Sequence, residues 1–432
     1  MDEPLDRKMN NSFVMKLLKE CSIFLLAKDV RLSEKLFNLN ELYVMWSTDT
    51  DEDYSADVYG FVTEMFAANV FRPLPPSSYA DTDEEVAAGR GGIGTAVVVG
   101  EPTADEVLEA TQTVLVYQVF RAFVDRVMFD ADRAQPYLNR RFVNGLVHRL
   151  NSGDADERLT VRDIAERVWT TCPAARSTMF RAAADELADF AYGYVPRHNG
   201  VNELLDFFAV TAGTAGHAAV PKLPRVLVCL LKHQSLSSFK SKLVECARAL
   251  KNDYKDLIPQ MLMFIKKLWS CQHLKTIVLL HTMMELYEWC DRDQWIQLQV
   301  QIVGHLSKLF SNDDFNLADL SINFWNRILH ENIKLWKTRP DVIKIVVANL
   351  KKVEQVHWNT DCIKMANCLL KLMVTRKIIN DKYAEEPEDD IFRDDKVNGN
   401  NYSLMTTHNT LMPLKHPNAV VDTISTITES II

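Results

Sequence analysis

The chain has 432 residues, of which 47% are hydrophobic and 25% charged, and its formal net charge is −9. A chain of this length can bury a sizeable core, either as two or three ordinary domains or as one repeat array. The negative charge disfavours a nucleic-acid binder, because neutralising phosphates supplies most of the affinity of such proteins. With only 14 glycines and 15 prolines, helix breakers are sparse, which favours a mostly helical chain.

Cysteine usage points to a reducing compartment. None of the eight cysteines forms a Cys-x-x-Cys pair, and most lie in apolar stretches of helical character, where a reduced cysteine acts as a small hydrophobe. The first eleven residues are charged and polar, and no apolar run reaches the length of a transmembrane helix. We therefore expect a protein of the cytoplasm, and of the nucleus as the second location.

The N-terminus is predicted to be a disordered arm, residues 1–11, followed by a helix whose N-cap is Ser12. Apolar residues recur at helical spacing after this cap and predict one buried stripe: Phe13, Val14, Leu17, Leu18, Cys21 and Leu25.

Two more helices are predicted before the chain changes character, at roughly 33–46 and 56–71. Three prolines between positions 73 and 76 cannot continue the second one, so the chain must leave the helix there. The next segment opens acidic and then holds five of the 14 glycines, which predicts a flexible loop at 79–104.

Helical periodicity resumes near Asp105 and continues to about Asn380, interrupted by short polar breaks. Three apolar helices open alike, at Asp256, Asp293 and Asp341, which lie 37 and 48 residues apart. These spacings bracket the ~40–47-residue period of two-helix HEAT repeats. We therefore predict an all-α, HEAT-like helical-repeat solenoid over residues 12–380, formed as a right-handed superhelix of antiparallel helix pairs.

The last segment, 381–432, is predicted to be an acidic and polar, mostly disordered tail. Its part from Glu385 to Asp395 carries seven acidic residues in eleven positions, and such a composition cannot bury a core.

Several segments resemble one known family, in the same order along the chain. The run from Met65 to Ser78 is similar to the family sequence MFAxNxFRxLPPSS, and Asp154–Arg158 is similar to its DPRER turn. The run from His198 to Leu205 is similar to HNGIxELL, and His357–Asn359 matches HWN. On these motifs, which span roughly 13–380, the chain is identified as a divergent member of the B-prime (56 kDa) family of protein phosphatase 2A regulatory subunits.

The resemblance implies a non-catalytic subunit that binds the scaffold and catalytic subunits of the phosphatase. It also implies recruitment of substrates through short Leu-x-x-Ile-x-Glu motifs, with apolar pockets for the Leu and Ile and basic side chains for the Glu. Four residues align with the family's motif groove: Arg167, Trp169, Arg176 and Phe207. Glu166 stands where the family has a groove histidine, so a negative charge lies beside the arginines.

No catalytic residue, cofactor or metal is expected. Gly89–Gly94 fits G-x-G-x-x-G, but no strand precedes it and no βαβ unit surrounds it. His281 and Glu285 lie one helical turn apart without a third ligand at a known spacing, and Cys271 with His273 does not make a triad. Loop, surface and packing roles are favoured for all of them.

One apolar helical stripe and a set of tryptophans are interpreted as core. This applies to the stripe Phe61, Met65, Ala68 and Phe71 and to the tryptophans Trp289, Trp295, Trp325, Trp336 and Trp358. For Arg167 and Arg176, the alternative interpretation is that they are solvated charges on a helix surface.

Three hypotheses for the function follow. The favoured one is a working regulatory subunit whose partners are proteins, without nucleic acid and without a membrane span. The alternative is a divergent HEAT-repeat adaptor that has lost phosphatase or motif binding. An enzyme would require a convergent polar constellation, which the sequence does not contain.

Overall fold

The computed structural model describes residues 5–48, 52–74, 103–213, 220–268, 273–331 and 333–380. The predicted loop, up to residue 102, and the predicted tail, 381–432, lie outside these ranges. The chain divides into two units, Met1–Asn380 and Asp381–Ile432, and the description below concerns the first.

The described residues of this unit form α-helices joined by short turns and three 3-10 segments. The first helices are α1 (Leu5–Cys21), α2 (Leu32–Thr48), α3 (Ala56–Val70), α5 (Ala104–Val124), α6 (Ala131–Ala134), α7 (Arg140–His148), α8 (Ala155–Thr171), α9 (Arg176–Ala191) and α10 (Val201–Thr211). They are followed by α11 (Leu223–Leu230), α12 (Leu236–Leu250), α13 (Leu257–Leu268), α14 (His273–Tyr287), α15 (Arg292–Leu306), α16 (Phe315–Glu331), α17 (Ile333–Trp336), α18 (Pro340–Val356) and α19 (Thr360–Thr375). The 3-10 segments are η1 (Arg149–Asn151), η2 (Pro173–Ala175) and η4 (Ser307–Leu309).

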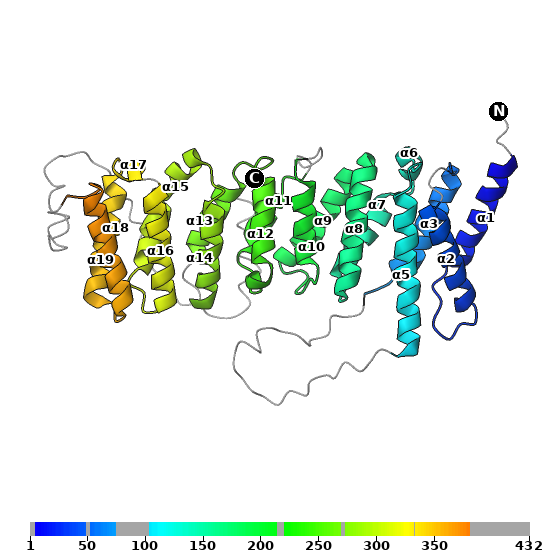
Figure 1. Cartoon of the computed structure of the whole chain (residues 1–432), viewed down its shortest axis with the longest axis horizontal. Helices are drawn as coiled ribbons and strands as arrows, with labels where there is room; N and C mark the ends of the chain where they lie inside the picture. The colour runs from blue at the N-terminus through cyan, green and yellow to red at the C-terminus, as the bar shows by residue number, and fades with distance from the viewer. Residues whose placement is uncertain are drawn as a thin grey trace, which may run out of the picture. The chain divides into compact units, whose positions relative to one another are not determined.

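The longer helices stand in two rows that follow the chain order (Figure 1). In the first row α1, α3, α7, α9, α11, α13, α15 and α18 pack in succession, and in the second row α2, α5, α8, α10, α12, α14, α16 and α19 do so. Each first-row helix also packs against the second-row helix that follows it in the chain, and a short turn or loop joins most such pairs. This arrangement confirms the all-α helical-repeat fold, whereas the handedness of the superhelix stays a prediction.

The predicted internal repeat corresponds to real pairs. The segments beginning at Asp256, Asp293 and Asp341 coincide with the starts of α13, α15 and α18, which are consecutive helices of the first row. The three helices have similar first residues because each one follows the polar turn at the end of the preceding helix pair. Each then buries apolar side chains against helices of both rows.

The predicted start of the first helix is wrong. Helix α1 begins at Leu5 rather than after Ser12, and Ser12 is an exposed residue within it. No glycine or proline lies between Leu5 and Cys21, and arginine, lysine and methionine are good helix formers, so polarity alone did not stop the helix. The predicted stripe is buried at Val14, Leu17, Leu18, Cys21 and Leu25, whereas Phe13 is exposed.

The next boundaries agree with the sequence. Helices α2 and α3 match the predicted 33–46 and 56–71 within two residues, and α3 ends before the prolines with Phe71 as its C-cap. Helix α5 begins with a capping box, in which Thr103 accepts from the Glu106 backbone and the Glu106 carboxylate accepts from Thr103.

The aromatic core is partly as predicted. Trp295, Trp325 and Trp336 are at most 3% exposed, so they anchor the repeats. Trp358 was wrongly placed in the core, because it is 66% exposed and its indole N–H donates to the carbonyl of Asp313, in the turn that precedes α16. The α3 stripe is also corrected: Met65 is buried, but Phe61, Ala68 and Phe71 line an open groove.

Candidate functional site

Two of the four predicted groove residues lie in the core. Trp169 of α8 and Phe207 of α10 are 4% and 2% exposed, and their rings meet edge to face with centroids 5.5 Å apart. The ring of Phe180 of α9 also contacts Trp169, with centroids 6.0 Å apart. These aromatic rings join α8, α9 and α10, and they leave little of either side chain on the surface.

Arg176, the first residue of α9, closes the end of α8. Its Nε donates to the Trp169 carbonyl at 2.7 Å and one terminal nitrogen donates to the Thr170 carbonyl at 3.2 Å. These are carbonyls of the last helical turn, which have no partner within the helix and which carry the negative end of its dipole. Its guanidinium also lies 5.9 Å from the Trp169 ring.

Arg167 lies on the exposed side of α8, and its side chain is 44% exposed. Its Nε forms an ion pair with Asp125, the C-cap residue of α5, so an internal carboxylate already accepts this guanidinium. The structure thus brings Arg176, Trp169 and Phe207 together, whereas Arg167 is engaged separately with α5.

The helix surface around Arg162 and Arg167 carries paired charges of both signs. Arg162 pairs with Asp163 at 3.0 Å, with Glu166 at 3.5 Å and with Asp206 of α10 at 3.5 Å. Partial burial, assisted by Asp163 and Asp206, raises the pKa of Glu166 despite the opposing effect of Arg162. Glu166 is therefore part of an ion-pair network centred on Arg162 of the same helix.

The segment Asp154–Arg158 connects neighbouring helix pairs of the array, a role that its sequence alone did not indicate. Asp154 caps α8, and Glu157 and Arg158 then bind partners on the two neighbouring second-row helices, α5 and α10. Glu157 accepts from Tyr117 of α5 at 2.7 Å and pairs with Arg149, and both carboxylate and guanidinium are about 10% exposed. Burial alone would raise the pKa of Glu157, but hydrogen bonds from Arg149, Ser152 and Tyr117 outweigh it and lower that pKa.

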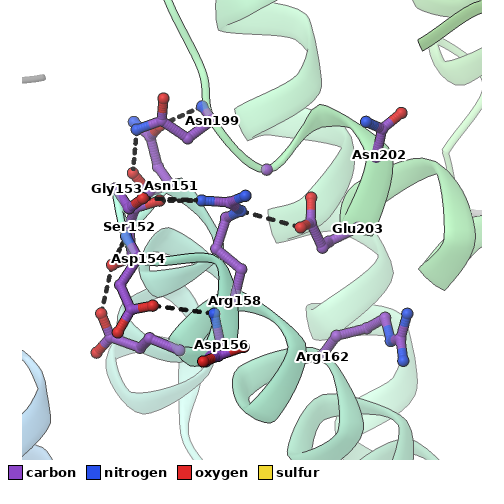
Figure 2. Close-up of polar contacts among 12 residues, drawn as sticks. Asn151, Ser152, Gly153, Asp154, Asp156, Arg158, Arg162, Asn199, Asn202 and Glu203 are labelled. Atoms are coloured by element: carbon purple, nitrogen blue, oxygen red, sulfur yellow. Dashed lines mark hydrogen bonds and ion pairs between the residues drawn. The ribbon is translucent and has the colours of Figure 1, made fainter. Parts of the chain in front are cut away.

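Arg158 connects to the following pair, as Figure 2 shows. Its Nε donates to Glu203 of α10 at 2.9 Å, and a terminal nitrogen donates to the Ser152 carbonyl at 2.9 Å. Beside it, Asn199 bonds Asn151 twice, at 2.9 and 3.1 Å (Figure 2).

A histidine turn recurs before helices of the second row. His198, His233 and His357 each accept, at Nδ1, the backbone N–H two residues further on, at 3.2, 3.2 and 3.0 Å. In the neutral ring Nε2 then carries the hydrogen, and in His357 it donates to the Asn312 carbonyl of the preceding turn at 2.9 Å. Each of these histidines lies three residues before the first residue of its helix, and this spacing is the sequence signal for the histidine turn.

His198 is also the buried member of a partly exposed ion cluster. Glu186 of α9 lies 3.0 Å from Nδ1 of His148 and 3.5 Å from Nε2 of His198. Burial would raise the pKa of Glu186, but the two imidazoles dominate and lower it to about 2, and the carboxylate in turn raises the pKa of His148.

The weaker chemical candidates have other partners or lie outside the described residues. Glu285 pairs with Lys240 at 2.6 Å, and the described residues contain no group of three acidic, histidine or cysteine side chains placed to hold a metal. Cys271, the side chain of His273 and the Gly89–Gly94 segment lie outside the described residues. Within the described ranges no helix is long and apolar enough to cross a membrane, and every described cysteine is a free thiol.

Comparison with known proteins gives one consistent family. The profile described as "Protein phosphatase 2A regulatory B subunit (B56 family)" matches residues 2–395. The chain is 25% identical over 379 residues to the alpha isoform of the human serine/threonine-protein phosphatase 2A 56 kDa regulatory subunit, covering 84% of this chain and 73% of that protein. It is 26% identical over 384 residues to the human beta isoform, covering 86% of this chain and 71% of that protein.

A worm relative is covered over a smaller share of its length. The Caenorhabditis elegans regulatory subunit pptr-1 is 26% identical over 341 residues, which are 77% of this chain and 59% of that protein. A solved engineered protein aligns over 88% of this chain and 96% of its own, at 13% identity and a TM-score of 0.32, which is too low to bear on the fold.

Proposed function

The chain belongs to the B56 family of protein phosphatase 2A regulatory B subunits, and on that premise we propose that it is a non-catalytic subunit which binds the phosphatase scaffold and catalytic subunits and recruits substrates. The observation that carries the proposal is the family match over residues 2–395, which includes every described helix pair. Recruitment works by effective concentration, since a substrate held beside an active site is turned over faster without new chemistry.

We propose Arg167 as the residue that meets the acidic position of a substrate motif. Its side chain is the exposed member of the four candidates, whereas Trp169 and Phe207 support α8 from the core and Arg176 fixes its end. An incoming glutamate must replace Asp125 at the guanidinium, and this exchange lowers the net gain from the contact.

The same ion pair, together with Glu166, favours the second candidate, a HEAT-repeat adaptor without motif binding. The Asp125 carboxylate already pairs with Arg167, and Glu166, the preceding residue, supplies no second cation there and pairs with Arg162 instead. The two candidates differ in whether a Leu-x-x-Ile-x-Glu peptide binds.

The experiment measures dephosphorylation of a phosphopeptide that carries a Leu-x-x-Ile-x-Glu segment, by scaffold and catalytic subunits with and without this chain. The proposal predicts a lower KM when the chain is present, and a loss of that effect with Arg167→Glu. Arg140→Glu is the matched control, because Arg140 is an exposed arginine of α7 without an ion pair among the described residues. Phosphatase stimulation that is the same for Arg167→Glu and the unaltered chain would remove Arg167 from the site, and an unchanged KM with the chain would favour the adaptor.

We also propose a cytoplasmic or nuclear location, supported by the free thiols of the described cysteines. Imaging of a fluorescently tagged chain tests it, and accumulation in the secretory pathway would contradict it.

A further inference from the structure

A groove of about 910 Å³ runs between α3 and α7 in the first row. One face of α3 forms its first wall, and the residues of this face follow helical spacing: Asp57, Gly60, Phe61, Glu64, Ala68 and Phe71. Tyr137, Arg141 and Gly145 lie on the other wall. Of the MFAxNxFR run, Ala67, Ala68 and Phe71 line the groove, and the substrate-recruitment proposal does not use it.

Aromatic rings hold the two helices apart. A Cβ atom built on Gly60 would lie 2.7 Å from the Tyr137 ring, and one built on Gly145 would lie 2.6 Å from the Phe71 ring. Each ring therefore packs directly on the backbone of the opposite helix, and α3 and α7 cannot close on each other. Phe61 is fixed at the edge by Lys19 of α1, whose ammonium lies 4.7 Å from the ring centroid.

The charged side chains that line the groove are available to a binding partner. Asp57 and Glu64 are exposed on the α3 wall, two turns apart, and Arg141 is exposed on the α7 wall. None of these three side chains has an ion-pair partner among the described residues. A guest would therefore find an apolar floor, an acidic edge along α3 and one cation on the opposite edge.

The dimensions fit a helix. The lined face of α3 extends from Asp57 to Phe71, which corresponds to about 21 Å at 1.5 Å per residue. A groove of this length has room for about four turns of a guest helix. A helix that buries one apolar face and leaves the other in solvent is the usual guest of such a groove.

We propose that the α3–α7 groove binds an amphipathic helix of a partner protein, with leucine-like anchors at i, i+3/i+4 and i+7 and a basic flank that faces Asp57 and Glu64. This site is separate from the Arg167 surface, so it stands or falls independently of motif recruitment.

The test uses the full chain and a fluorescein-labelled synthetic helix of about 14 residues, with leucines on one face and lysines on its flanks. A second peptide carries glutamates in place of the lysines. Fluorescence polarisation should give a Kd of about 1–100 μM for the lysine peptide and at least about fivefold weaker binding of the glutamate peptide. Ala68→Trp fills the groove at an exposed position and should abolish binding, and Glu64→Lys should weaken it by about fivefold or more.

Glu34→Lys is the matched control, because Glu34 is exposed on α2, outside the groove, and has no ion pair among the described residues. It makes the same change in net charge and should shift the Kd by less than about twofold. The proposal is overturned if the lysine peptide binds all variants equally, which would mean general attraction to an acidic protein, or if it does not bind the unaltered chain. It is also overturned if the chain self-associates through the groove, seen as a dimer in ultracentrifugation that Ala68→Trp dissociates.

Discussion

The joint between the α7–α8 and α9–α10 pairs depends on a glycine, and Gly200→Ala should damage it. Gly200 precedes α10 with φ of −100°, a conformation that alanine adopts without strain. The obstacle is space, because a Cβ atom at this position would lie 1.8 Å from the Leu150 carbonyl oxygen. Since the obstructing atom belongs to the backbone, no side-chain rotation can relieve the overlap.

The cost follows from what must move. Overpacking of this kind costs ~1–3 kcal/mol, and a shift of α10 away from η1 also strains the two Asn199–Asn151 hydrogen bonds, each worth about 1 kcal/mol. We expect the variant to lose about 3 kcal/mol of stability. Because repeat arrays need not unfold in a single step, hydrogen exchange of α8 and α10 should be measured together with the denaturation midpoint.

Gly153→Ala provides the matched control. Gly153 lies in the same joint, and a Cβ atom there would meet nothing within 4 Å, so the change should alter stability by less than about 0.5 kcal/mol. Equal midpoints and equal exchange rates for the two variants would refute the argument that the Leu150 carbonyl excludes a side chain at Gly200.

Three further predictions concern the same part of the array. Arg149→Met leaves the Glu157 carboxylate buried without its cation and should cost ~3–5 kcal/mol in chemical denaturation, against little change for exposed Arg140→Met. Arg176→Met removes two bonds to the α8 end and should cost ~1–2 kcal/mol, together with faster exchange at the end of α8; unchanged exchange would contradict the capping role. His148→Gln tests the Glu186 cluster through the pH dependence of stability. Because Glu186 raises the pKa of His148 in the folded state, the stabilisation by His148 is complete below the pKa that this histidine has in the unfolded chain. It is lost as pH rises through the pKa of the folded state. The variant should therefore lose more stability relative to the unaltered chain at pH 6 than at pH 8, and a loss that does not depend on pH would contradict this ion pair.

Local features of the fold were readable from the sequence, because they depend on neighbours in the chain. The ends of α2 and α3 followed from apolar spacing and from prolines, and the repeat followed from three similar helix starts. The start of α1 was missed because a polar but breaker-free segment can still be helical.

The candidate site was less predictable, because its properties arise from residues far apart in the sequence. Nothing local to Arg167 indicates that Asp125, on another helix, accepts its guanidinium. Whether Trp169 and Phe207 face a groove or each other depends on how α8 and α10 pack, and periodicity does not determine that. The α3 stripe was assigned to the core for the same reason, because an apolar helix face next to an open groove looks like any buried face.

The central claim is that the chain assembles with the phosphatase, and the most direct measurement mixes it with purified protein phosphatase 2A scaffold and catalytic subunits. Size-exclusion chromatography with light scattering should show one species of equimolar composition at moderate salt. A chain that is helical by circular dichroism yet elutes apart from the scaffold–catalytic complex would contradict the claim.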